Sequence, residues 1–282
     1  MLIRAVILIC LSAGPGLAQN LQSHCIALSE GISGVRFAAF SDGLSREEVR
    51  LNYVGHSTYL IVTPSGRGIA TDYTGWLGSE APLPDVVTMN RGHSSHWTAN
   101  PDPNIPHILR GWGDFETPAE HYLSLDDELL IRNVTTDLRS RVAERQKDAN
   151  SIFIFETAGL CIGHLGHLHH EPTEQHYALI GRLDVVMVPV DGGMTLPTEA
   201  MIRVMRRLKA QLVLPMHWFG ESTLAYFLSE LSDEFEIETP GVATTTVSLR
   251  TLPRTPTIRV LRPAPFRPAA GPEVELEVEE AE

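Results

Sequence analysis

The sequence has little positive charge, few cysteines and no long apolar run beyond its first residues. Lys and Arg together number 22 against 35 Asp and Glu, so the formal net charge is −13 and the pI is about 5.4. Nucleic-acid binders need a basic surface, and anionic membranes attract basic segments, so this balance argues against both partners. We therefore expect no nucleic-acid partner.

The N-terminus is typical of a secretory signal peptide. Arg4 is followed by an apolar run at residues 5–11, and Gly16-Leu17-Ala18 resembles a cleavage site. The run is shorter than the roughly 18 apolar residues of a spanning helix. An uncleaved membrane anchor and a misassigned start are the alternatives. We expect residues 1–18 to be removed, the mature protein to be periplasmic or secreted, and no stable membrane insertion to remain.

Cysteine is scarce: the chain has three. Cys10 lies in the predicted signal peptide, which leaves Cys25 and Cys161 in the mature protein. In an oxidising compartment these two are candidates for a disulfide bond. Two buried free thiols fit the sequence equally well.

The composition, with 43% hydrophobic and 20% charged residues, suits a globular core. Apolar–polar alternation and short apolar runs bounded by Gly or Pro predict strands, and 3.6-residue periodicity predicts helices. The predicted strands are residues 49–54, 57–63, 68–71, 85–89, 129–134, 151–155, 160–162, 185–190 and 212–215; the predicted helices are 174–180 and 198–209. Residues 98–121 are predicted to form a long loop. β-Strands followed by alternating strands and helices indicate an α/β fold, with sheets covered by helices.

The C-terminus changes in composition. Five prolines lie between residues 253 and 268, and the last ten residues are rich in glutamate. Such segments resist regular structure, so residues 253–282 are predicted to be a disordered tail and residues 19–252 a single domain.

The histidines follow predicted strands. His93 and His96 come after the strand at 85–89, residues 164–170 contain four histidines after the strand at 160–162, and His217 follows the strand at 212–215. His56 follows the first strand. Open α/β sheets bind ligands at such strand ends, and imidazole is the commonest metal ligand. The pattern predicts a metal site, although a lone His-x-x-His or a His-rich loop is also common without one.

The order of these motifs resembles the metallo-β-lactamase superfamily, most of all the branch of L-ascorbate-6-phosphate lactonase and related metal-dependent hydrolases. The resemblance covers about residues 49–220. It is carried by Gly55-His56-Ser57-Thr58, Ile162-Gly163-His164-Leu165-Gly166 and Val213-Leu214-Pro215-Met216-His217. It implies an αβ/βα sandwich of two mixed β-sheets flanked by helices.

The ligand motif departs from the family pattern. Arg91 and Ser95 stand where the family has a ligand His and the motif Asp, and His167 stands where it has the metal-bridging Asp. A fixed cation at Arg91 argues against two metals. The resemblance therefore implies one ion, zinc or a similar divalent metal, held by His96, His167 and His217.

Further residues are assigned supporting roles. His93 is a further candidate ligand, and His93, His169 and His170 are reserve ligands or proton carriers. Asp72 either orients a ligand imidazole or caps a strand end. Arg91 either pairs with an anionic substrate or forms a structural salt bridge.

Three functions fit these features. The first is a metal-dependent hydrolase in which metal-activated water attacks an ester, lactone or phosphoester. The second is a catalytically inactive relative that binds a ligand. The third is a metal-handling protein that uses the histidines of residues 164–170.

Overall fold

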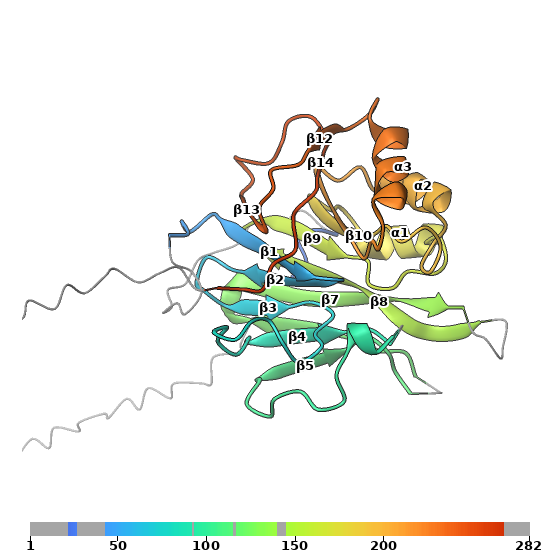
Figure 1. Cartoon of the computed structure of the whole chain (residues 1–282). Helices are drawn as coiled ribbons and strands as arrows, with labels where there is room; N and C mark the ends of the chain where they lie inside the picture. Colours follow the sequence, from blue (N-terminus) through green and yellow to red (C-terminus); the bar gives the residue numbers. More distant parts are fainter. Residues whose placement is uncertain (1–21, 27–42, 92, 115–116, 140–144, 268–282) are drawn as a thin grey trace, which may run out of the picture.

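The computed structural model describes residues 22–26, 43–91, 93–114, 117–139 and 145–267 (Figure 1). Within them the chain forms two mixed β-sheets packed face to face, as the sequence predicts. The predicted signal peptide, residues 1–18, lies outside the described residues. None of the described helices is long and apolar enough to cross a membrane.

The first sheet has six strands in the order β13-β1-β2-β3-β4-β5. Its strands are β1 (Val49–Gly55), β2 (Thr58–Val62), β3 (Gly68–Ala70), β4 (Val86–Met89), β5 (His107–Arg110) and β13 (Thr244–Val247). β1 to β3 form an antiparallel meander, and β3, β4 and β5 run parallel. A 3-10 helix, η1 (Ser94–His96), follows β4. β5 lies inside the segment that the sequence predicts as a long loop, so that loop is shorter than expected.

The second sheet has eight strands in the order β12-β14-β11-β10-β9-β8-β7-β6. They are β6 (Tyr122–Leu125), β7 (Leu129–Leu138), β8 (Gln146–Thr157), β9 (Leu160–His164), β10 (Val185–Pro189), β11 (Leu212–Met216), β12 (Glu236–Glu238) and β14 (Thr257–Arg259), with η2 (Asp126–Glu128) before β7. β9, β10 and β11 run parallel, so their C-terminal ends lie at one edge.

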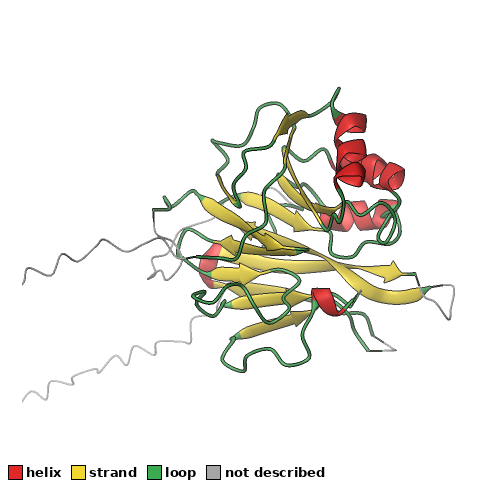
Figure 2. Ribbon diagram, in the orientation of Figure 1, coloured by secondary structure: helices red, strands yellow, loops and turns green. Residues whose placement is uncertain are grey.

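The core is divided by the alternation of side chains along the strands. On β8, Phe153 and Phe155 pack between the two sheets, whereas Ile152 and Ile154 pack toward the helices. The helices α1 (Glu174–Ile180), α2 (Thr198–Leu208) and α3 (Glu221–Leu231) gather on that side of the molecule (Figure 2). The outer face of the first sheet is covered mainly by loop residues such as Leu77 and Ile105. In the described residues, helices therefore cover one outer face of the sandwich.

The folded domain continues past its predicted end at residue 252. β14 pairs in parallel with both β11 and β12, and Phe266 packs on the outer face of the first sheet. The prediction of a tail from residue 253 was therefore wrong up to residue 267. The prolines there flank a three-residue strand rather than interrupt it. The acidic end, residues 268–282, lies outside the described residues.

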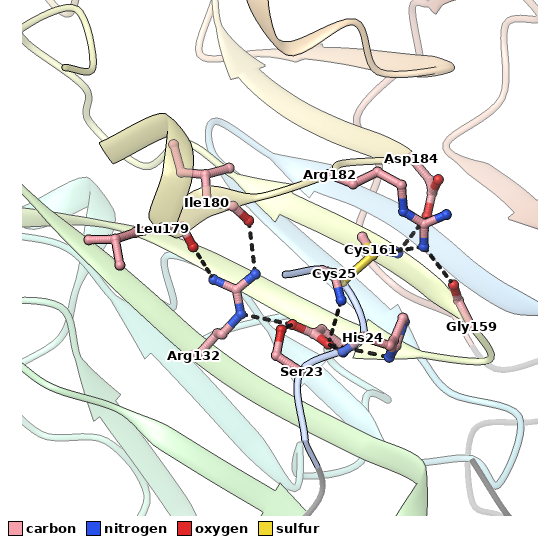
Figure 3. Close-up of a disulfide and its surroundings, with 11 residues drawn as sticks. Ser23, His24, Cys25, Arg132, Gly159, Cys161, Leu179, Ile180, Arg182 and Asp184 are labelled. Atoms are coloured by element: carbon pink, nitrogen blue, oxygen red, sulfur yellow. Dashed lines mark hydrogen bonds and ion pairs between the residues drawn. A yellow bond between two sulfur atoms is a disulfide. The ribbon is translucent and has the colours of Figure 1, made fainter. Parts of the chain in front are cut away.

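Cys25 and Cys161 form a disulfide bond that fastens an N-terminal segment to β9 (Figure 3). Beside it, the buried carboxylate of Glu156 accepts hydrogen bonds from Ser23 Oγ at 2.6 Å and His24 N at 2.9 Å, and from Arg132 Nε at 2.8 Å. Arg132 also donates to the backbone carbonyls of Leu179 and Ile180 at the end of α1. The disulfide fastens the N-terminal segment to the sheet, and the polar cluster around Glu156 and Arg132 links both to the end of α1.

Candidate metal centre

The side chains of interest lie just beyond strand ends. Asp72 follows β3 and His96 ends the 3-10 helix after β4; Asp191 follows β10 and His217 follows β11. His56 lies in the turn between β1 and β2, and its carbonyl accepts a hydrogen bond from His217 N at 2.8 Å. This backbone contact brings the edges of the two sheets together. The predicted strand-end histidines His96 and His217 therefore lie next to one another in the fold, together with His56.

His96 is buried and held by a buried carboxylate. Its Nδ1 lies 2.6 Å from Asp72 Oδ2 and 2.9 Å from Ser57 Oγ, while Asp72 Oδ1 accepts from Asn90 Nδ2 at 2.8 Å. Burial raises the pKa of Asp72, but electrostatic interactions with His96 and His164 and the hydrogen bonds from His96 and Asn90 outweigh it, and the pKa falls to about 2. Asp72 is therefore ionised and accepts the Nδ1 proton of His96.

His217 has an equivalent arrangement on the other sheet. Its Nδ1 lies 2.8 Å from Asp191 Oδ2, and Asp191 Oδ1 accepts from the backbone N–H groups of Gly193 and Thr195 at 2.9 Å. Burial raises the pKa of Asp191, but the hydrogen bonds from His217, Thr195 and Gly193 outweigh it and hold the pKa below its usual range. The carboxylate of Asp191 therefore both closes the turn after β10 and holds His217.

The two orienting carboxylates determine which nitrogens face the site. With Nδ1 of each ring donating to a carboxylate, the neutral rings of His96 and His217 present lone pairs at Nε2. These two Nε2 atoms lie 3.1 Å apart. Lone pairs at this distance repel unless a cation, a proton or a metal ion, lies between them. Two nitrogens on a tetrahedral zinc, at bond lengths of 2.0–2.1 Å, are about 3.3 Å apart, so the pair fits a shared metal.

His56 supplies a third imidazole. Ligand-type nitrogens of His56, His96 and His217 all lie within 4.8 Å of one another. His56 Nε2 is buried without a hydrogen-bond partner. Burial, followed by electrostatic interactions with His217 and His96, lowers the pKa of His56 to about 4, so its ring is neutral at pH 7 and able to bind a metal. Three imidazoles with room for a further ligand are the donor set of hydrolytic zinc sites.

Local backbone geometry also marks this group. His56, Asp72 and His217 have positive φ values of 53°, 43° and 54°. Side-chain-bearing residues adopt this region rarely and at a cost, and such residues cluster at functional sites. The positive φ values turn the chain at these three residues, so that two imidazoles and one orienting carboxylate point in directions that an extended strand would not allow.

The loop after β9 adds His167 to the surroundings. The His167 ring centroid lies 4.7 Å from that of His96 and 5.1 Å from that of His217. The loop turns at Gly166, where φ is 59° and a Cβ atom would lie 2.5 Å from Asn90 Nδ2 and 2.6 Å from Asn150 Oδ1. Only glycine fits this close approach, and Asn150 Oδ1 then accepts the backbone N–H of His167 at 2.8 Å.

The predicted site residues are distributed unevenly around this group. His96 and His217 lie in it, and His167 lies beside it, but the third nitrogen that comes within 4.8 Å of both is that of His56. His93 is exposed, with its ring centroid 4.7 Å from His167 and 6.3 Å from His96. His170 is half-buried and Arg91 is exposed, and neither belongs to the three-histidine group. In the sequence, His56 follows the first predicted strand and belongs to the Gly55-His56-Ser57-Thr58 motif, but it is not among the predicted metal ligands.

A profile of the β-lactamase superfamily domain matches residues 50–217, which is more than half of the chain and includes all three grouped histidines. The chain belongs to the metallo-β-lactamase superfamily. No protein of curated function matches the sequence.

Several solved structures share the fold. A protein described as a zinc-dependent hydrolase of the metallo-β-lactamase superfamily, from Thermotoga maritima, is 22% identical with a TM-score of 0.52, over 76% of this chain and 98% of that one. Igni18, described as a metallo hydrolase from Ignicoccus hospitalis, is 18% identical with a TM-score of 0.51, over 79% and 97%. A protein described as a metal-dependent hydrolase from Parabacteroides distasonis is 12% identical with a TM-score of 0.52, over 66% and 89%.

Asp72→Asn is expected to lower the affinity for Zn²⁺ about 10- to 100-fold, the usual effect of losing a carboxylate that orients a ligand histidine. Asp72 accepts from both His96 and Asn90. An amide offers one oxygen, so one of these donors would face an NH₂ group. Zinc affinity is measured by competition with a chromophoric chelator. Asp85→Asn is the matched control, because Asp85 binds Gly68 N at the start of β3. Equal affinities in both variants would contradict the role of Asp72.

Acidification is expected to destabilise the metal-free protein through His164. This fully buried ring donates from Nε2 to Ser57 O at 2.8 Å and accepts Gly166 N at Nδ1 at 3.1 Å, so both nitrogens are used by the neutral form. Burial lowers its pKa. The unfolded chain gains a proton below about pH 6.5 that the folded chain excludes, so stability falls as pH falls through that value, by at most about 1.4 kcal/mol per pH unit.

Urea unfolding in the presence of chelator, from pH 7.5 to 5, measures this effect. The slope of the unfolding free energy against pH should be smaller in His164→Gln than in the wild-type protein. Identical slopes would show that His164 does not contribute.

Proposed function

We propose that this protein is a metal-dependent hydrolase that holds one divalent ion, most simply zinc, on His56, His96 and His217. The observation that carries the proposal is the pair of Nε2 atoms 3.1 Å apart, each on a ring whose Nδ1 is bound to a buried carboxylate. Nitrogen ligands with orienting carboxylates are typical of zinc centres. A bound ion of this kind would supply hydroxide at neutral pH and polarise a substrate oxygen.

The residues of this chain would have separate tasks. His56, His96 and His217 would bind the ion. Asp72 and Asp191 would keep the His96 and His217 rings in the tautomer that offers Nε2 and would increase the basicity of that nitrogen. We propose substrates with an ester, lactone or phosphoester bond, in keeping with the resemblance to the L-ascorbate-6-phosphate lactonase branch.

We further propose that the protein is exported and acts on a small, anionic molecule. The Cys25–Cys161 disulfide supports export, because such bonds persist in oxidising compartments and are rare in reducing ones. Arg91 is exposed three residues before the 3-10 helix that carries His96, and is a candidate partner for a substrate anion.

Elemental analysis combined with a substrate panel tests the proposal. The protein is isolated without chelator, and its metal content is measured beside its hydrolysis of 4-nitrophenyl acetate, a γ-lactone and bis(4-nitrophenyl) phosphate. One equivalent of metal and a chelator-sensitive turnover of one substrate class are expected. Protein without stoichiometric metal would overturn the proposal.

Two other results would favour one of the alternative functions over hydrolysis. One tightly bound ion without turnover of any substrate class would indicate an inactive relative, a reading motivated by Arg91, Ser95 and His167 at the family's ligand positions. Several weakly bound, exchangeable ions would indicate metal handling by the histidines of residues 164–170.

A further inference from the structure

His167 is a buried imidazole whose two nitrogens have different surroundings. Nδ1 lies 2.7 Å from His169 Nε2, whereas Nε2 is buried and has no hydrogen-bond partner. The other rings around His167 are those of His93, His96 and His217. Since the two nitrogens diverge across the ring, the unpartnered Nε2 lies on the side away from His169, and the rings of His96 and His217 are neighbours of the His167 ring.

A fixed backbone donor determines the tautomers of both rings. The backbone N–H of Arg139 donates to His169 Nδ1 at 2.7 Å, so Nδ1 carries a lone pair and the proton of neutral His169 is on Nε2. This Nε2–H donates to His167 Nδ1, which must also carry a lone pair. Neutral His167 therefore carries its proton on Nε2.

A second proton on either ring would break the hydrogen bonds that determine these tautomers. A proton on His169 Nδ1 would face the Arg139 N–H, and a proton on His167 Nδ1 would face the His169 N–H. Each ring therefore keeps one N–H and one lone pair in this arrangement.

We propose that His167 is a hydrogen-bond donor to an anionic oxygen of the bound ligand, and that it is not a ligand of the metal. A metal ligand needs a lone pair at the coordinating nitrogen, and the relay from Arg139 through His169 leaves an N–H at that position instead. This inference takes one element from the proposed function, the presence of a metal ion next to His167. His169 is the positioning residue, because it acts through His167.

The chemical class that this donor suits is an oxyanion. A buried N–H group forms a stronger hydrogen bond to a charged oxygen than to a neutral one. Phosphoryl oxygens carry such charge in the ground state, and a carbonyl oxygen gains it when the carbonyl carbon is attacked. His167 stands where the family has its bridging carboxylate, so a neutral donor replaces an anion there.

The first test reads the tautomer directly. Long-range ¹H–¹⁵N correlation spectra of protein labelled at histidine distinguish a protonated from an unprotonated ring nitrogen. We expect His167 to be protonated at Nε2 and unprotonated at Nδ1, with and without Cd²⁺. In His169→Ala the hydrogen bond to His167 Nδ1 is lost, and signals of both His167 tautomers are expected. A proton on Nδ1, or coupling of His167 Nε2 to ¹¹³Cd, would overturn the proposal.

The second test uses inorganic phosphate as the probe. His167→Ala is expected to keep one equivalent of metal and to bind phosphate about 10- to 100-fold more weakly than the wild type, as for loss of a hydrogen bond to a charged group. His107→Gln is the matched control, because His107 begins β5 at the opposite end of the parallel strands. Unchanged phosphate affinity, or loss of the metal from His167→Ala, would contradict the proposal.

The two tests separate this inference from the proposed function. If the wild-type protein binds no metal, the metal centre is wrong, but the tautomer spectrum of the metal-free protein and its phosphate titration still decide the role of His167. If the metal is present and the Nε2 proton is absent, the hydrolase proposal stands and the donor proposal fails.

Discussion

His96→Ala is expected to lower zinc affinity by more than about 100-fold, because losing a ligand should cost more than losing a residue that orients one. The same loss is expected for His217→Ala. The two Nε2 atoms lie 3.1 Å apart and would bind the same ion. We therefore expect the two losses to be strongly non-additive, so that the zinc affinity of the double variant is close to that of either single variant. Calorimetric titration of the metal-free proteins measures each affinity.

Folding must be followed in the same variants. His96→Ala leaves Asp72 buried without its principal donor, so circular dichroism and urea unfolding should accompany each titration. His107→Gln again serves as the control for loss of a histidine elsewhere. One equivalent of tightly bound zinc in a folded His96→Ala or His217→Ala protein would show that these rings do not share an ion.

The fold was largely predictable because its signals are local. Short apolar strands such as β10 and β11 read as runs buried on both faces, and α2 as an amphipathic helix. The C-terminal strand β14 was missed because it is three residues long and surrounded by prolines. Its structure depends on pairing with β11 and β12, which lie far from it in the sequence, and no local pattern reports such pairing.

The site was predictable in its location but not in its membership. Strand-end histidines indicated the edge of the sheets at which the three-histidine group lies. The nearness of His56 to His217 results from the contact between a turn of one sheet and a strand end of the other, for which periodicity gives no signal. The tautomer of His167 depends on one backbone N–H at Arg139, 28 residues earlier, and only the folded structure shows that contact.

Loss of the Cys25–Cys161 disulfide is expected to lower the free energy of unfolding by about 2–5 kcal/mol. The bond closes a loop with a sequence separation of 136, so it removes much conformational freedom from the unfolded chain. Its loss also frees the segment whose Ser23 Oγ and His24 N donate to the buried Glu156 carboxylate. Urea unfolding of the Cys25→Ser/Cys161→Ser double variant measures the change.

Ser23→Ala separates the two contributions, because it removes one donor to Glu156 and keeps the disulfide. It should cost less than the double cysteine variant, about 1.5–3 kcal/mol for a hydrogen bond to a charged group, and it should remain sensitive to reductant. Wild-type protein in reductant should unfold like the double variant, whereas the double variant itself should not respond to reductant. A wild-type protein that is equally stable with and without reductant would show that the N-terminal segment is held by the Glu156 cluster alone. In that case Arg132, which joins Glu156 to the end of α1, would be the residue that stabilises this face of the sheet.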